Sequence, residues 1–205
     1  MANSSISFGK DLAKSVFPHL CVGCELPKLL TKEQLCSSCT LQLPLFKWNS
    51  VTNNAAYDVF KGRLPFEGAF ALMKFSKQGI TQKIMHDIKY NGNKKLAFEM
   101  GQKLGKAMQN VEWNIPLAGI IPVPLHPKKE EKRGFNQAIE LGKGLAQELE
   151  IPILSRAIER TRQTETQTKK NRIERIENLL GAFNSKKFKN NGNYLLIDDV
   201  LTTGA

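Results

Sequence analysis

The sequence predicts an α/β fold in which helices cover both faces of a parallel sheet, preceded by a small cysteine-rich module. Two observations lead to this prediction. All four cysteines fall within residues 21–39. From about residue 67 onward, apolar runs typical of buried strands alternate with segments whose apolar residues recur every third or fourth position. We therefore divide the 205 residues into an N-terminal helix with the cysteine module (1–48), a linker or covering segment (49–66) and an α/β domain (67–205).

The same patterns place the elements in chain order. Residues 6–17 have the spacing of a short amphipathic helix that ends before Pro18, whereas residues 49–66 are polar and rich in turn formers. In the α/β domain, apolar runs predict strands, and four-residue spacing predicts helices. The expected strands are 69–75, 118–124 and 194–197, and the expected helices are 80–88, 96–104 and 135–149.

The cysteines form two CxxC pairs, separated by 11 residues, that together predict a four-sulfur metal site. Each pair can present two thiolates from one tight turn, and two such turns complete the tetrahedron that zinc prefers. Two disulfides are the alternative, and redox catalysis is a weaker one because no βαβ pattern surrounds either pair. We expect Zn²⁺ to be structural, since so short a module cannot bury enough surface by itself. The four ligands would be Cys21, Cys24, Cys36 and Cys39.

The chain is strongly basic, with 30 Lys and Arg residues against 19 Asp and Glu residues and a net charge of +11. This excess favours polyanionic partners, first nucleic acid, then acidic membrane surfaces and phosphorylated metabolites, although solubility alone is an alternative. No apolar stretch reaches the length of a membrane span, and the N-terminus lacks the pattern of an export signal. We therefore expect a cytoplasmic protein, in which thiols stay reduced.

The final residues, YLLIDDVLTTGA (194–205), combine two adjacent acids with a stretch suited to binding an anion. If residues 194–197 form a parallel strand, the two acids lie at the sheet edge where α/β proteins bind ligands. Carboxylates there can accept hydrogen bonds from sugar hydroxyls, and a turn rich in hydroxyl and N–H groups can hold phosphate. The pattern therefore predicts a site for a ribose 5′-phosphate. Its residues would be Asp198, Asp199, Thr202, Thr203, Gly204 and Ala205.

This ending closely resembles the binding motif of type I phosphoribosyltransferases, and further motifs resemble the ComF family. Besides the CxxC pairs, these motifs are KYNG (89–92), IPVPLH (121–126), RGFNQ (133–137), RQTETQ (162–167), RIEN (175–178) and GAF (181–183). The resemblance implies a zinc ribbon joined to a type I phosphoribosyltransferase-like domain that takes phosphoribosyl pyrophosphate (PRPP) with Mg²⁺. It also implies a role in DNA uptake during natural transformation, with competence-machinery proteins as further partners. Because such a phosphate loop normally continues into a helix, we expect this domain to be shortened at its C-terminus.

The resemblance also provides candidates for binding pyrophosphate. They lie in the loop after the strand at 118–124, in the RGFNQ motif and in the basic segment 155–175. These residues are Lys128, Lys129, Arg133, Asn136, Gln137, Arg162, Gln167 and Arg175. The two lysines stand where the family often has arginine, and a solvated loop is an equal alternative for them. The basic segment can be read as a loop that closes over pyrophosphate, as a nucleic-acid contact or as plain surface.

Three functions are consistent with these features. The first, which we favour, is a DNA-uptake protein that binds PRPP with Mg²⁺ and single-stranded DNA. The second is an active phosphoribosyltransferase, in the glycosyltransferase class, with an unknown acceptor. The third is a regulatory module that binds its ligand without catalysis. No general base, nucleobase pocket or ladder of aromatic residues identifies an acceptor, so whether the protein is an enzyme stays open.

Overall fold

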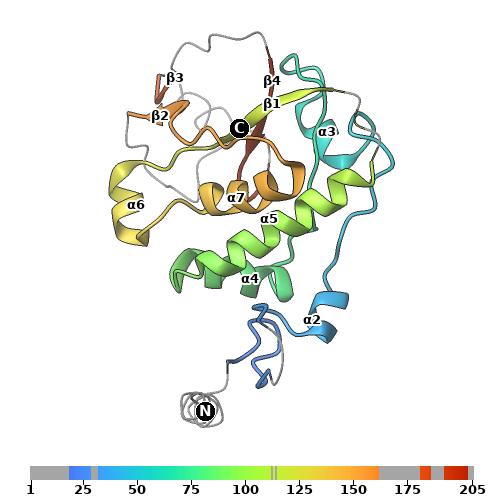
Figure 1. Ribbon diagram of the computed structural model, residues 1–205, viewed down its shortest axis with the longest axis vertical. Coiled ribbons are helices and arrows are strands. Elements are labelled where there is room, and N and C mark those ends of the chain that lie inside the picture. The colour runs from blue at the N-terminus through green and yellow to red at the C-terminus, as the bar shows by residue number, and fades with distance from the viewer. Residues whose placement is uncertain are drawn as a thin grey trace, which may run out of the picture.

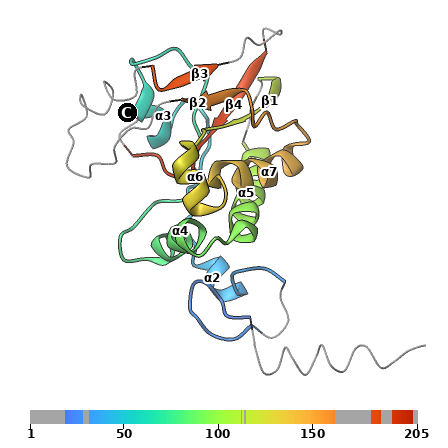
Figure 2. The ribbon, with the colours of Figure 1, turned by 90° about the vertical axis from the view of Figure 1, so that its left-hand side faces the viewer.

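The computed structural model describes residues 19–28, 32–111, 113, 115–161, 181–185 and 192–202. In Figure 1 the cysteine module lies at one end of the molecule, and the strands lie toward the other end. Helices α4 and α5 lie between them, and the view turned by 90° shows the same order (Figure 2). The predicted N-terminal helix and most of the basic segment 155–175 lie outside the described residues.

The cysteine module is a pair of turns followed by a short helix. Leu20 and Pro27 form an antiparallel bridge around the first cysteine pair. The second pair begins helix α2, Ser37–Leu41. The module packs onto the rest of the chain through an apolar cluster that joins Cys21 and Cys39 to Ile84 and Leu96. Its few apolar residues therefore gain a core from the helices beneath it.

Helices α4, Ile80–Tyr90, and α5, Lys94–Gln109, confirm the two helices predicted from four-residue spacing. The residues that defined the spacing, Ile84, Ile88 and Leu96, are at most 1% exposed. Asn93 separates the two helices, and its side chain accepts a hydrogen bond from the Leu96 N–H at 2.9 Å. It thereby caps α5, because an asparagine at this position satisfies an N–H that the first turn leaves open.

Helix α7, Gln137–Leu149, confirms the third predicted helix and packs closely against α5. Glycines make this approach possible, because a Cβ at Gly101 would overlap the Leu141 carbonyl and one at Gly144 would overlap the Phe98 carbonyl. The two backbones therefore touch where side chains normally separate helices. This contact fixes α7 as the layer between α5 and the sheet (Figure 1).

The described sheet beneath α7 is small and parallel. Strand β1, Leu117–Pro122, pairs in parallel with β4, Asn193–Ile197. Ile120 and Ile197, which are at most 4% exposed, form the core between the sheet and α7. Both predicted strands and their parallel pairing are thus confirmed, whereas the larger sheet and its second helical layer remain predictions.

Four other elements lie in the described part of the chain. Strands β2, Ile158–Arg160, and β3, Phe183–Ser185, form an antiparallel pair, and α6, Pro127–Arg133, follows β1. Helix α3, Ala55–Phe60, lies within the segment predicted to be a linker or cover.

The strand predicted at residues 69–75 is wrong. This segment is irregular, and its only ladder contact among the described residues is a single bridge between Met73 and Leu45. The Trp48 indole donates a hydrogen bond to the Ala71 carbonyl at 2.5 Å. A side chain thus takes a carbonyl that a sheet ladder would use, so an apolar run was misread as a strand.

Candidate functional site

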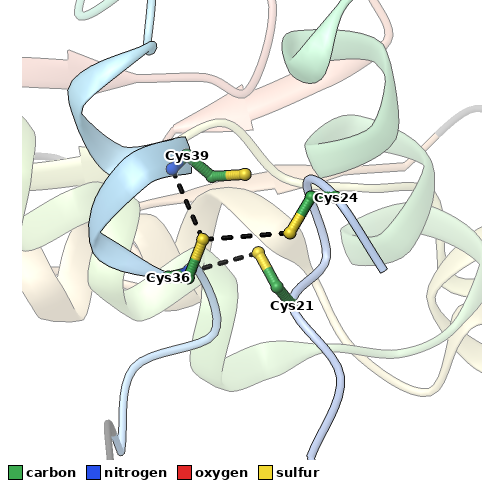
Figure 3. A group of neighbouring side chains, drawn as sticks. All are labelled: Cys21, Cys24, Cys36 and Cys39. Atoms are coloured by element: carbon green, nitrogen blue, oxygen red, sulfur yellow. Dashed lines mark hydrogen bonds between the residues drawn. The ribbon is translucent and has the colours of Figure 1, made fainter. Parts of the chain in front are cut away.

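The four cysteines form one cluster, as predicted from their spacing. Their sulfur atoms all lie within 4.8 Å of one another, and Cys24 Sγ is 3.9 Å from Cys36 Sγ. Four sulfurs at the zinc–sulfur bond length on a tetrahedron would be about 3.8 Å apart. All four cysteines are free, so the disulfide alternative is wrong. Figure 3 shows the sulfurs converging from the first turn and from the start of α2.

Backbone N–H groups aimed at the sulfur atoms prepare this cluster for a cation. The Cys36 N–H donates to Cys21 Sγ at 3.2 Å, and the Cys39 N–H donates to Cys36 Sγ at 3.4 Å. Burial raises the pKa of the Cys21 thiol, but hydrogen bonds from Cys24, Cys36 and Gly23 outweigh it and lower the pKa to about 6. Burial, together with the other three cysteines, raises the pKa of Cys39 to about 12. Four thiolates this close need a cation, so the cluster can bind a structural metal ion.

The two adjacent acids lie where the sequence predicted them, beyond the carboxyl ends of two parallel strands. Pro122 pairs with Ile197, and the Val123 N–H donates to the Ile197 carbonyl at 2.9 Å, so β1 and β4 end together. Asp198 and Asp199 follow at once. The Asp199 N–H donates to Asp198 Oδ1 at 2.8 Å, which holds the Asp198 carboxylate against the backbone of Asp199.

Lys89, at the end of α4, forms an ion pair with Asp199. Its Nζ lies 2.9 Å from Asp199 Oδ2, and the two side chains are only 22% and 14% exposed. An ion pair shielded in this way is stronger than one on the open surface. From the sequence, Lys89 was recognised only as part of the KYNG motif and was not predicted as a site residue. The KYNG motif was the one sign in the sequence that Lys89 could belong to the site, because residue spacing cannot predict a contact between residues 89 and 199.

The electrostatics of Asp198 identify Arg160 as a second site residue that was not predicted from the sequence. Although the residue as a whole is exposed, loss of hydration and repulsion from Asp199 raise the pKa of the Asp198 carboxyl to about 6. Lys89 and Arg160, on β2, oppose this rise. Burial lowers the pKa of the Arg160 guanidinium, and Asp198 opposes that shift in turn. Arg160 was predicted only as one of many basic residues in its segment.

Helix α6 adds cations to the same neighbourhood. Burial lowers the pKa of the Lys129 ammonium, with further lowering by the positive charges of Arg160 and Arg133. Lys128 is exposed in the first turn of α6. The helix begins at Pro127 and ends at Arg133, and the next residue, Gly134, caps it with a φ of 76°. This left-handed conformation costs glycine little and ends α6 beside the buried Phe135.

We call the resulting group the acid-pair site. Two acids that directly follow β4 and four cations from α4, α6 and β2 are close enough for the electrostatic interactions described above. Its members are Lys89, Lys129, Arg133, Arg160, Asp198 and Asp199.

Two other predicted residues are buried in this structure. Asn136 is 4% exposed, its amide donates to the Val123 carbonyl at 3.0 Å, and its oxygen accepts from the Ala138 N–H at 2.9 Å. It therefore caps α7 and ties that helix to the loop after β1. Gln137 is 1% exposed, and no hydrogen-bond partner for its Nε2 is found within the described part of the chain. Direct contact of either side chain with pyrophosphate stays a prediction.

The remaining predicted site residues are described only in part. Thr202 is exposed three residues beyond Asp199. The others lie outside the described residues: Thr203, Gly204, Ala205, Arg162, Gln167 and Arg175. The phosphate-binding turn and the closing loop therefore remain predictions.

Comparison with known proteins finds relatives with related names. The chain is 40% identical to Competence protein F of Haemophilus influenzae over 89 residues, which is 42% of this chain and 39% of that protein. It is 37% identical to Competence protein ComFC of Bacillus subtilis over 87 residues, 42% of this chain and 33% of the relative. It is 30% identical to DNA utilization protein YhgH of Salmonella typhi over 125 residues, 60% of this chain and 55% of the relative.

The chain is a homologue of the ComF proteins. The resemblance predicted from the motifs is thereby confirmed. The matched part of this ComF homologue spans between a third and about half of the length of the relatives named above. No family model matches the chain, and no solved structure matches it. Within the described residues, no helix has the length and apolar character needed to cross a membrane.

Proposed function

We propose that this protein serves DNA uptake as a ComF-type protein that binds PRPP with Mg²⁺ at the acid-pair site and also binds single-stranded DNA. The observation that supports the ligand site best is the Lys89–Asp199 ion pair, 2.9 Å long, at the shared end of two parallel strands. The ion pair places a carboxylate, which can bind sugar hydroxyls, beside an ammonium group, which can bind phosphate. The proposal includes the type I phosphoribosyltransferase-like fold and its division at residues 1–48, 49–66 and 67–205.

The chemistry of the acid-pair site matches both ends of PRPP. Asp198 and Asp199 present adjacent carboxylates, which accept hydrogen bonds from the two ribose hydroxyls. Lys89, Lys129 and Arg160 supply positive charge for the pyrophosphate, and the turn that begins near Thr202 would receive the 5′-phosphate. Mg²⁺, when bound, would neutralise part of the pyrophosphate charge. Lys129 and Arg160 have already lost part of their hydration in the folded protein, so an anion that binds them replaces interactions with water that they no longer make.

The DNA partner rests on charge and on the relatives. The net charge of +11 favours a polyanion, and the names of the relatives refer to competence and to DNA utilization. We further propose that the cysteine cluster holds zinc, since four cysteine sulfurs within 4.8 Å of one another suit this ion. A cytoplasmic location follows if the thiols are to remain reduced.

Catalysis is the second candidate function, and the gathering of cations around the acid pair favours it. In a transfer reaction the C1–O bond to pyrophosphate breaks, pyrophosphate leaves with the bonding pair, and an amine or base bonds to C1. Cations would stabilise the departing pyrophosphate, and the carboxylates would hold the ribose as positive charge develops on it. The described residues offer no acceptor pocket that identifies the attacking group.

DNA binding measured across salt concentrations, with and without PRPP and Mg²⁺, tests the favoured function. We expect affinity for a single-stranded oligonucleotide to fall steeply with salt, because neutralised phosphates release counterions. We also expect calorimetry to detect PRPP binding that is lost in the Asp198→Asn, Asp199→Asn double variant. Asp58→Asn, an exposed acid on α3, is the matched control. Salt-independent or absent DNA binding would refute the DNA partner, and unchanged PRPP binding in the double variant would refute the site.

A further inference from the structure

Helix α4 contacts the cysteine module with one side chain and the acid-pair site with another. Near its start, Lys83 Nζ donates to the Gly23 carbonyl at 2.9 Å and lies 2.7 Å from Glu25 Oε1. Near its end, Lys89 forms the ion pair with Asp199. The two lysines are six positions apart on the helix, a rise of about 9 Å. One rigid element therefore touches both sites.

The module side of this connection lies inside the first CxxC pair. Gly23 stands between Cys21 and Cys24, and a Cβ there would lie 2.7 Å from Cys39 Sγ and 3.0 Å from Ile80 Cδ1. The turn that presents the sulfur atoms is thus in direct packing contact with the first residue of α4. A metal ion that closes this turn would also fix the carbonyl to which Lys83 donates.

The far end of α4 is tied to the module as well. Asp87 accepts a hydrogen bond from the Asn93 amide at 2.6 Å, and the same amide donates to Gln34 Oε1 at 2.9 Å. Gln34 lies two residues before Cys36, so both ends of α4 are connected to the segments that carry the ligands. In the core beneath, Ile84 and Ile88 pack in one cluster with Cys21 and Cys39.

We propose that the metal-bound cysteine module positions Lys89 for PRPP binding through α4. This inference rests on the proposed function, because it concerns the same ligand site. In the bound state the Lys89 ammonium is shared between Asp199 and the anionic end of the ligand. Lys83 is a positioning residue. Its loss removes a contact between α4 and the module, so Lys89 occupies the position that binds the ligand for a smaller fraction of the time.

Binding of PRPP with Mg²⁺ to three variants of the chain tests this proposal. Lys89→Met removes the ammonium, and Lys83→Met removes the tie to the module without touching the acid pair. Lys143→Met is the matched control, since Lys143 is 50% exposed and 2.8 Å from Glu140, whereas Lys83 is 49% exposed and 2.7 Å from Glu25. We expect Lys89→Met and Lys83→Met each to weaken binding about tenfold, within the usual range of coupling between sites. Lys143→Met should leave binding unchanged.

A double variant separates positioning from a general effect. If Lys83 acts through Lys89, then Lys83→Met should weaken binding no further in a chain that already carries Lys89→Met. Additive losses would overturn the proposal. Glu25→Gln, which alters only an exposed carboxylate that is 71% accessible, provides a second way to weaken the tie should Lys83→Met fold poorly.

Metal affinity provides an independent measurement. Coupling between two binding sites is reciprocal, so saturating PRPP with Mg²⁺ should raise the affinity for Zn²⁺ by the factor by which zinc raises PRPP affinity. Competition with a zinc-selective chelator measures this factor without any assay of activity. A zinc affinity that PRPP does not change, in a chain that binds PRPP, would overturn the proposed connection alone. Absence of PRPP binding in the unaltered chain would overturn the proposed function and this inference together.

Discussion

The cysteine cluster and the acid-pair site differ in how far apart in the chain their parts lie. The cluster draws all its ligands from residues 21–39 and from two turns. The acid-pair site draws its groups from α4, α6, β2 and the segment after β4, between residues 89 and 199. Local turns can build the first, whereas only packed helices and a sheet can build the second. The two sites should therefore respond differently to changes in ligands, packing and charge.

The largest expected effect is the loss of a metal ligand. Cys39→Ser should abolish stoichiometric metal binding and unfold the cysteine module, because metal binding supplies much of the folding free energy of such a module, about 10–16 kcal/mol in zinc-finger peptides. Metal content by mass spectrometry and hydrogen exchange of residues 19–28 check this. Ser37→Ala, an exposed neighbour in α2, should retain the metal. Full metal content in Cys39→Ser would show that three sulfurs suffice.

Packing between α5 and α7 should affect the second site more than the first. Gly144→Ala places a methyl group against the Phe98 carbonyl and should cost about 1–3 kcal/mol in the free energy of unfolding. Urea unfolding measures this cost, with Gly79→Ala as the control, because a Cβ there meets nothing closer than 3.4 Å. We expect PRPP binding to weaken, because α7 packs on β1 and β4, and metal content to stay unchanged. Loss of metal with intact PRPP binding would contradict the comparison.

The raised pKa of Asp198 predicts a pH-dependent effect. In the folded protein this pKa is about 6, above its ordinary value of 3.8, so ionisation of Asp198 lowers stability as pH rises from about 4 to 6. Asp198→Asn should therefore raise the melting temperature at pH 8 by about 2–4 °C, the shift that 1 kcal/mol gives in a chain of this size. The gain should shrink as pH falls through 6 and vanish below about pH 4.

Asp199→Asn is the control for this pH effect. It removes the partner of Lys89, so it should lower the melting temperature at pH 8 instead of raising it. Melting curves of both variants between pH 3.5 and 8 decide the matter. An Asp198→Asn gain that persists unchanged at pH 3.5 would show that the effect does not come from ionisation.

The smallest effect is expected from an exposed ion pair outside both sites. Lys106 Nζ lies 4.0 Å from Glu148 Oε1 and is 67% exposed. Lys106→Ala should change the free energy of unfolding by less than about 1 kcal/mol, as for most surface pairs. Neither metal content nor PRPP affinity should change. A large loss of either would mean that the α5–α7 surface takes part in a site.

Several features were predictable because neighbours in the chain decide them. The spacing of Ile80, Ile84 and Ile88 predicts α4 since a helix brings every fourth residue to one face. The strand predicted at 69–75 is wrong because the backbone of an apolar segment can hydrogen-bond to a side chain, here the Trp48 indole, and not only to a neighbouring strand. Pyrophosphate binding by Asn136 stays a prediction, and the structure adds that its amide and oxygen both hydrogen-bond to the backbone.

The sequence alone determined the cysteine cluster, the main helices, the parallel strands and the position of the two acids at the end of β4. These depend on short-range spacing and on where an apolar run stops. Only the tertiary structure brought Lys89 and Arg160 to that acid pair and raised the pKa of Asp198. Long-range contacts of this kind depend on how α4 packs and on which groups lose water. Short-range sequence patterns predict neither of these.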